Sequence, residues 1–514
     1  MRTKTAAIIF FGLLFFLISK HSSSMDNRLK ALGNLQLAVP DSENQLGFYY
    51  FGKNPAGLVY ARSGQRMNLY WNSRHTWGDY HRLYDPLKEQ DYSLKFEGVK
   101  TMNKKETFWG SVTYMGDYPR QVYRSLEQYP YRKNFILTDT TTGNFWYNGP
   151  VISAVYSRKL PFNFSVGAAF NYKVQMGLKN VYTKVESIRW AFFPGIGIAW
   201  RLKQNPTTTF KQPFSKSENS KIGLGFFVFP YNSQTRLTAV KELQDALLYR
   251  QIGLDTRFQQ VRSKYIRIYR TKGLILGGQM FLSLGRHSRL GIAHFYRSSG
   301  NSVTDNLFIK RGYEQMIFNR TTGRLVYQKN GFRIAGQMTY SNREDWSKTI
   351  EYGSLYGENN QNRFTAGIGF GLNRKWIPAV VGAEIYWGHF SRNFKDYLAH
   401  QSIAAEANEW EFRTGAEFPL FRGNWRLRVG GNAGEKVPGP FFMYRRERFW
   451  SVSGGLGWRQ PQFRVSIAAI YRSKSPKGKL YLLEQPAFNG ARFLPGDVRR
   501  NLVFQFMLQL YTFE

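Results

Sequence analysis

Apolar and polar residues alternate along most of the chain, and the clearest example is the segment from Ser187 to Lys203. One parity of this segment is apolar and includes Trp190 and Trp200, whereas the other holds glycine, alanine and arginine. Successive side chains of a β-strand point to opposite faces, so the segment has one apolar face and one small or cationic face. The two tryptophans are ten residues apart, which is ~33 Å of strand, or ~25 Å of height at a tilt of ~40°. This matches the apolar band of an outer-membrane barrel, and we predict that the strand crosses a lipid bilayer.

The same alternation predicts further strands along the chain, and with this one they number 18. Their approximate ranges are 66–78, 91–100, 106–116, 149–159, 162–175, 187–203, 220–231, 273–285, 288–298, 321–329, 331–342, 363–373, 378–391, 408–419, 424–434, 448–459, 463–473 and 499–513. The predicted fold is all-β, a closed antiparallel transmembrane β-barrel of about 16–18 strands. A soluble β-propeller or β-sandwich is the alternative, but a propeller would show a repeat of ~40–50 residues, and we find none.

The connections between these segments alternate in length, as expected when short periplasmic turns face long external loops. Short connections are predicted at Arg158–Pro161, Gly285–Ser288, Lys329–Gly331, Asn373–Ile377, Leu420–Asn424 and Arg459–Gln462. Long ones are predicted at 117–148, 232–272, 299–320, 343–362, 392–407, 435–447 and 474–498. The connection 204–219 is long where a turn is expected. Pro194 has no edge strand to occupy in a closed barrel, so we predict a β-bulge there.

The N-terminal part of the chain has a different character. Residues 1–24 are predicted to be a secretory signal, because a basic start precedes an apolar core from Ala6 to Ile18 that is short for a membrane span. An uncleaved membrane anchor is the alternative. Residues 25–62 lack clear alternation and are predicted to form a periplasmic or hatch-like segment, and residues 63–514 the barrel.

Composition narrows the choice of compartment and partner. The formal charge is +38, which favours anionic partners, but the export signal argues against nucleic acid. Cysteine is absent, so neither disulfides nor a lipidated N-terminal cysteine are available. After the signal there is no run of ~18 apolar residues, hence no predicted transmembrane helix. We expect a Gram-negative-type outer membrane, with its lipid and a small solute as partners.

Arginine recurs on the parity opposite the apolar face, which would point into the barrel. These lumen-charge candidates are Arg189, Arg201, Arg289, Arg333, Arg363, Arg426, Arg428 and Arg464. Acids on that parity are fewer, and Glu384 is one of them. Rings of arginine raise the local concentration of anions in a pore, so an anion-leaning lumen is predicted; a merely solvated face is the alternative.

The sequence Phe48 to Leu58, which contains Asn54, Pro55, Ala56 and Gly57, resembles the Asn-Pro-Ala segment of long-chain fatty-acid transporter-type outer-membrane barrels. In that group the segment lies near the mature N-terminus, in a hatch that plugs the barrel. The resemblance implies a hatch here, although an ordinary turn entering the first strand is the alternative. The whole chain also resembles a large family of uncharacterised outer-membrane barrels. Fatty-acid transporter barrels have fewer strands and a more apolar interior, so their substrate is not carried over.

The closing strand ends in Phe513 and Glu514, and it resembles the C-terminal signal that the barrel-assembly machinery recognises. His389 and Ser391 have the His-x-Ser spacing of outer-membrane lipid hydrolases, on the parity that faces lipid. The histidines are scattered, and we expect neither a metal site nor a cofactor.

The predicted function is that of an outer-membrane channel or passive transporter for small solutes, anion-leaning or hydrophobic, and not an enzyme. The alternatives are an envelope barrel that anchors partner proteins and, third, a lipid hydrolase using His389 and Ser391.

Overall fold

The computed structural model describes most of the chain. The described residues are 30–39, 46–61, 65–81, 84–103, 105–128, 135–181, 183–203, 220–239, 248–252, 259–261, 265–285, 287–351, 353, 355–373, 379–398, 400–421, 424–437, 444–480 and 498–512. The predicted signal at 1–24, the connection 204–219 and the last two residues, Phe513 and Glu514, lie outside them.

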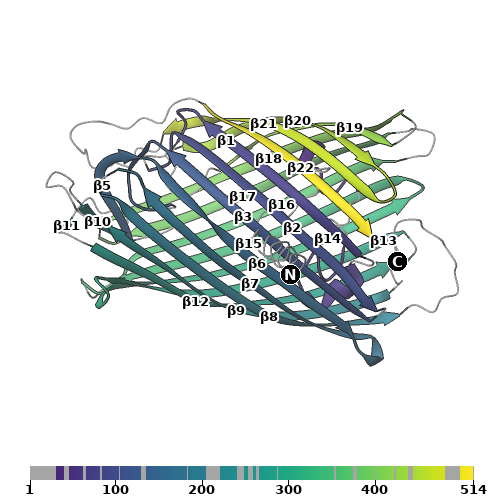
Figure 1. The fold of residues 1–514 in the computed structure, drawn as a ribbon, viewed down its shortest axis with the longest axis horizontal. Helices are drawn as coiled ribbons and strands as arrows, with labels where there is room; N and C mark the ends of the chain where they lie inside the picture. Colours follow the sequence, from purple (N-terminus) through teal and green to yellow (C-terminus); the bar gives the residue numbers. More distant parts are fainter. Residues whose placement is uncertain are drawn as a thin grey trace, which may run out of the picture.

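An 18-stranded antiparallel sheet closes on itself to form the barrel (Figure 1). Its strands are β1 (Gln65–Trp77), β2 (Lys88–Asn103), β3 (Glu106–Arg120), β6 (Phe145–Lys159), β7 (Phe164–Lys179), β8 (Val185–Lys203), β9 (Ser220–Ala239), β12 (Tyr265–Leu284), β13 (Ser288–Asp305), β14 (Ile309–Lys329), β15 (Phe332–Thr349), β16 (Leu355–Leu372), β17 (Val380–Asp396), β18 (Gln401–Leu420), β19 (Trp425–Lys436), β20 (Tyr444–Arg459), β21 (Phe463–Leu480) and β22 (Arg499–Thr512). The closing pair is β1 with β22, in register from Gln65 opposite Thr512 to Trp77 opposite Arg500. Each strand pairs with its neighbour on both sides, so the described wall has no free edge.

The remaining elements are short. A second sheet of four strands contains β4 (Val122–Ser125), β5 (Phe135–Gly143), β10 (Leu248–Ile252) and β11 (Gln259–Val261). The helical turns are η1 (Pro55–Gly57), α3 (Leu58–Ala61) and η3 (Pro161–Asn163). None of the helices in the described part of the chain is long and apolar enough to span a membrane.

The outward face of the wall is apolar, and β8 shows it most clearly. Ile188, Ile196 and Ile198 are 45%, 63% and 44% exposed, whereas Ala191 and Ala199 on the other face are 2% and 1% exposed. Large aliphatic side chains would not stay exposed on a protein in water, but they suit a surface that contacts hydrocarbon. The alternation in the sequence therefore corresponds to a lipid face and an interior face.

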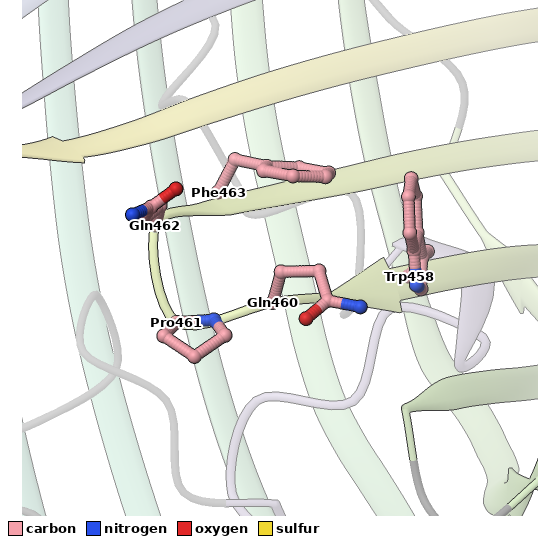
Figure 2. A pocket seen from close by; sticks show the side chains of 5 residues that line it. All are labelled: Trp458, Gln460, Pro461, Gln462 and Phe463. Carbon is pink, nitrogen blue, oxygen red and sulfur yellow. The ribbon is translucent and has the colours of Figure 1, made fainter.

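Aromatic side chains mark the rim at the short-turn end. Trp458 and Phe463 flank the turn between β20 and β21, with ring centroids 4.8 Å apart (Figure 2). Trp458 also stacks on Trp425 of β19 at 5.7 Å. The shallow hollow beside this turn is lined by Trp458, Gln460, Pro461, Gln462 and Phe463. Rings with this placement are typical of an interfacial girdle, and the hollow holds no ionisable group.

The predicted number of strands is confirmed, and their short-turn ends agree with prediction to within a few residues. The prediction was wrong where it placed long connections at 299–320, 343–362 and 392–407. There the strands continue, and the connections span only 306–308, 350–354 and 397–400. Beyond the lipid band an outward side chain need not be apolar, so the alternation fades while the hydrogen-bonded ladder continues.

The ladder between β8 and β9 has a gap in the middle of the wall. The two strands keep one register on both sides of it, which places Pro194 opposite Pro230 at its centre. The predicted bulge at Pro194 is therefore wrong, because no register shift occurs there. Proline lacks an amide hydrogen, so neither Pro194 nor Pro230 can donate a backbone hydrogen bond. Inter-strand hydrogen bonds are therefore missing in a region where lipid cannot replace them.

Replacing both prolines with valine (Pro194→Val, Pro230→Val) should stabilise the barrel. Two restored inter-strand hydrogen bonds are worth ~1–3 kcal/mol together, and guanidinium unfolding followed by tryptophan fluorescence would measure the gain. Pro419→Val is the matched control, because the ladder between β18 and β19 continues through Pro419. A lower unfolding midpoint for the double variant would show that the prolines hold a wall shape that valine cannot adopt.

Candidate functional site: the barrel interior

The described part of the N-terminal segment, residues 30–39 and 46–61, packs against the inward faces of the barrel strands. Its first part contacts β15 to β20, and its second part contacts β3, β6 to β9 and β12 to β14. Together these strands form an unbroken arc of the ring from β3 to β20. The described parts of the segment therefore lie inside the lumen along most of its wall, near the end where the short turns lie.

Glu384 on β17 ties down the first part of the segment. Its Oε1 accepts hydrogen bonds from three successive backbone N–H groups, those of residues 36–38, with the first at 2.6 Å and the last at 2.8 Å. Glu384 is 1% exposed, and Tyr386 donates to its Oε2 over 2.9 Å. Converging amides form an anion-binding nest. Without the carboxylate these buried donors would be unsatisfied, which makes Glu384 the principal contact of this part.

Side chains from neighbouring strands donate to carbonyl oxygens of the same part. The pairs are Arg333 Nε with Leu37, Arg413 with Asn34 and Ser453 Oγ with Ala31, at 2.6, 3.1 and 3.0 Å. Polar atoms of the segment are thus satisfied by the wall rather than by a core of its own.

Asn54 fixes the second part of the segment. Its side-chain amide donates to the carbonyl oxygens of Ile198 on β8 (3.0 Å) and Phe226 on β9 (3.2 Å). Its Oδ1 accepts from the backbone N–H of Ala56 over 3.0 Å and so caps η1, where Pro55 suits the first position. An aspartate could cap the turn but could not donate to the wall, so the amide serves both purposes.

The wall uses serine and glycine where the segment approaches it. Ser157 and Ser165 donate to the carbonyl oxygen of Ala56 over 2.9 and 3.0 Å. A Cβ atom at Gly197 would lie 2.1 Å from Asn54 Oδ1, and one at Gly430 would lie 2.2 Å from the backbone nitrogen of Gly33. A larger residue at either position would push the segment away from the wall.

The four-stranded sheet packs against the inward faces of the wall at the opposite end of the barrel. Phe135 of β5 is fully buried against Tyr356, with ring centroids 5.4 Å apart. Tyr269 of β12 donates to the carbonyl oxygen of Phe135 and to Glu127, both over 2.6 Å. The barrel is therefore narrowed at both ends, at one by the N-terminal segment and at the other by this sheet. The four strands of this sheet lie within predicted loops, so the alternation along the chain did not reveal them.

The eight predicted arginines all lie on inward-facing positions, but their surroundings differ. Arg363 pairs with Glu409 at 2.9 Å, and Arg426 and Arg428 both pair with Glu417, at 3.7 and 2.8 Å. Arg333 is held by the N-terminal segment, and the Arg201 guanidinium lies 3.6 Å from the ring centroid of Tyr60. Arg189 and Arg464 lie on β8 and β21, and Arg289 on β13 makes no ion pair with any described residue. The anion-attracting role of the eight stays a prediction.

The His-x-Ser pair lies on the outward face of β17. His389 Nδ1 is 3.1 Å from Oδ1 of Asn408 on β18, a neighbour that the sequence did not indicate. No hydrogen bond joins His389 to Ser391 among the described residues. In this structure the histidine is thus oriented by an amide but does not contact the serine that it would have to activate.

An acidic cluster faces the lumen on β2 and β3. Carboxylate oxygens of Glu89, Asp91 and Asp117 lie within 4.8 Å of one another. Arg74 of β1 forms ion pairs with Asp91 and, at 3.7 Å, with Glu89. The cluster is therefore partly neutralised by the protein itself.

A closed antiparallel barrel with an apolar outward face and aromatic rims defines the protein as an outer-membrane β-barrel of the Gram-negative type. Residues 55–449 match the model of a family described as "Family of unknown function (DUF6850)", and the chain belongs to that family. No curated protein matches the sequence.

Several solved outer-membrane barrels are similar to the chain at low sequence identity. A FadL homologue from Pseudomonas aeruginosa has 10% identity and a TM-score of 0.37, over 97% of this chain and 99% of that one. The alcaligin outer-membrane receptor FauA from Bordetella pertussis has 7% identity and a TM-score of 0.43, over 86% and 75%. The toluene transporter TbuX from Ralstonia pickettii has 10% identity and a TM-score of 0.33, over 95% and 98%. Similarity at this level says nothing about the solute.

Glu384→Ala should release the first part of the N-terminal segment and leave the barrel folded. Losing the shared acceptor costs at least ~2 kcal/mol locally, which corresponds to an increase of about 30-fold or more in amide exchange at residues 36–38. Hydrogen exchange read by mass spectrometry would measure it. Glu409→Ala on β18 is the control, because Glu409 binds Arg363 and the backbone of Val437. Equal exchange in both variants would contradict the role of Glu384.

Proposed function

We propose that this protein is an outer-membrane channel through which small solutes pass when the N-terminal segment moves. The observation that carries the proposal is that this segment lies inside the lumen along most of its wall and is tied there by hydrogen bonds from inward-facing side chains. A segment with this position obstructs passage, and its displacement opens a route.

The wall supports the proposal because it is complete without the segment. The β1–β22 pair closes the barrel from residue 65 onward, so displacement of residues 30–39 and 46–61 breaks no inter-strand hydrogen bond. Barrels of about 16–18 strands leave an aqueous channel unless they are plugged. The inward face carries charged and polar side chains, as expected for a water-filled passage rather than a packed core.

The ties that hold the segment have a strength suited to a movable obstruction. Each hydrogen bond contributes ~0.5–1.5 kcal/mol, and those to charged groups ~1.5–3 kcal/mol. The contacts made by Glu384, Arg333, Arg413 and Asn54 therefore hold the segment firmly without making its release prohibitive. The hydrolase alternative lacks a hydrogen bond between His389 and Ser391. The anchoring alternative differs from the proposal in a measurable way, because a barrel that only anchors partners would pass no current.

Asn54→Ala should increase the frequency of channel opening in planar lipid bilayers. The variant loses two hydrogen bonds to the wall and the cap of η1, ~2–4 kcal/mol in all. Asn68→Ala is the matched control, because Asn68 is also buried but donates to Glu97 within the wall, over 2.7 Å.

An Asn54→Ala protein that conducts as wild type does, with residues 48–58 shown by hydrogen exchange to be released, would contradict the proposed obstruction. A wild-type protein and variant that both pass no current would favour the anchoring alternative.

A further inference from the structure

Four arginines follow one another along the inward face of β13 and β14. In the register of this pair, Arg289 lies opposite Val326, Arg324 opposite Gly291, Arg320 opposite Phe295 and Arg297 opposite Phe318. We call these four residues the arginine track. Arg289 and Arg297 are eight residues apart on one strand, so the track covers ~26 Å of strand and ~20 Å of height at a tilt of ~40°.

The face of the track is the lumen face. Ala293, between the two arginines of β13, is 1% exposed, and Thr322 and Val326 of β14 are each 8% exposed. Arg297 Nε donates to Tyr231 of β9 over 3.1 Å, and that tyrosine lies on the inward face. Because side chains alternate, Arg289 and Arg320 share this face, and both are exposed to the lumen.

Two arginines of the track, Arg289 and Arg320, form no ion pair within the parts of the chain that the structure describes. Arg297 is bound by a tyrosine hydroxyl, and Arg324 Nε donates to Gln337 over 2.9 Å and also interacts electrostatically with Glu384. Other walls differ, since Arg363, Arg413, Arg426 and Arg428 each pair with glutamate. Described glutamates therefore neutralise the arginines of those walls, whereas none of them pairs with Arg289 or Arg320.

Guanidinium groups that form no ion pair with a described residue, such as those of Arg289 and Arg320, favour a solute that carries negative charge. Guanidinium presents its donors in a planar fork that matches carboxylate and phosphate oxygens. Neighbouring arginines repel one another in a medium of low dielectric, and a bound anion relieves that repulsion. A spaced series of such sites lets an anion pass from one to the next, because each site binds it weakly enough to release it.

We propose that the arginine track is the solute-binding path of the lumen, and that it takes small anions bearing carboxylate or phosphate groups. This inference rests on the proposed function as a channel and names its solute class. The track leads to the N-terminal segment: the Arg324 guanidinium lies 5.3 Å from the ring centroid of Phe51, and a Cβ at Gly291 would lie 2.7 Å from Leu46. An anion at the lower end of the track therefore sits beside the part that must move.

The test compares two double variants of the full-length protein in detergent. Arg289→Gln with Arg320→Gln removes two charges from the track. Arg363→Gln with Arg426→Gln removes two lumen charges that are paired with glutamate and whose side chains are 38% and 37% exposed. Calorimetric titration with pyrophosphate, citrate and uncharged glucose measures binding, and circular dichroism verifies folding.

We expect wild type and the paired-arginine control to bind pyrophosphate and citrate but not glucose, and the track variant to bind both anions at least about tenfold more weakly. Raising the ionic strength should weaken binding, because salt screens the exposed guanidinium groups. Binding of only one of the two anions would assign the track to phosphate or to carboxylate. Equal losses in both double variants, or a wild type that binds neither anion at low salt, would overturn the proposal.

Reversal potentials in bilayers under a salt gradient separate this inference from the proposed function. Wild type and the paired-arginine control should prefer anions, and the preference of the track variant should be shifted toward cations. This result supports both the channel and the arginine track. Conductance without ionic preference would overturn the arginine track and leave the channel, whereas anion binding without conductance would overturn the channel and leave the binding site. If the glutamine variant does not fold, the double variant Arg289→Lys with Arg320→Lys replaces it. Lysine keeps the positive charge but lacks the planar fork of guanidinium. Unchanged anion affinity in the lysine variant would overturn recognition by guanidinium.

Discussion

The structure depends on the pairing of every strand with two neighbours in a medium that offers no other hydrogen bonds. Lipid cannot satisfy a free N–H or C=O group, so the sheet must close, and β1 meets β22 to close it. Once the backbone is satisfied by the wall alone, the side chains divide by parity between lipid and lumen. The gap at Pro194 and Pro230 is a departure from this constraint, and it is tolerated because the ladder is regular on both sides.

Closure also explains how the interior can be polar. Inward side chains need not form an apolar core, because the barrel is held by its backbone ladder. Carboxylates such as Glu384 and Glu417, and the amide of Asn54, are thus available for specific contacts. They hold an N-terminal segment against the inner wall at one end and neutralise arginines on several walls. Along β13 and β14, Arg289 and Arg320 form no ion pair with any described residue, and this distinguishes that wall from the others.

Much of the candidate site was visible in the sequence, but its partners were not. Asn54 was singled out by its Asn-Pro-Ala context, and Glu384 was noted as a rare acid on the inward parity. Parity placed Arg426 and Arg428 inside the barrel, yet their neutralisation by Glu417 depends on the register between β18 and β19. Arg320 was not singled out because it lies just before the segment 321–329 in which alternation is clear, whereas Arg324 lies within that segment and was overlooked.

The sequence by itself determined the class of fold, the number of strands and which face of each strand meets lipid, because these follow from a local alternation that hydrocarbon imposes on every second residue. Only the tertiary structure decided where the strands end outside the membrane, that a small sheet narrows one end, and that residues 30–39 and 46–61 line the wall at the other. It also decided which of the inward-facing arginines form ion pairs with glutamate. Those outcomes depend on contacts between residues far apart in the chain, such as Leu37 with Arg333 or Asn54 with Phe226, and no local pattern encodes them.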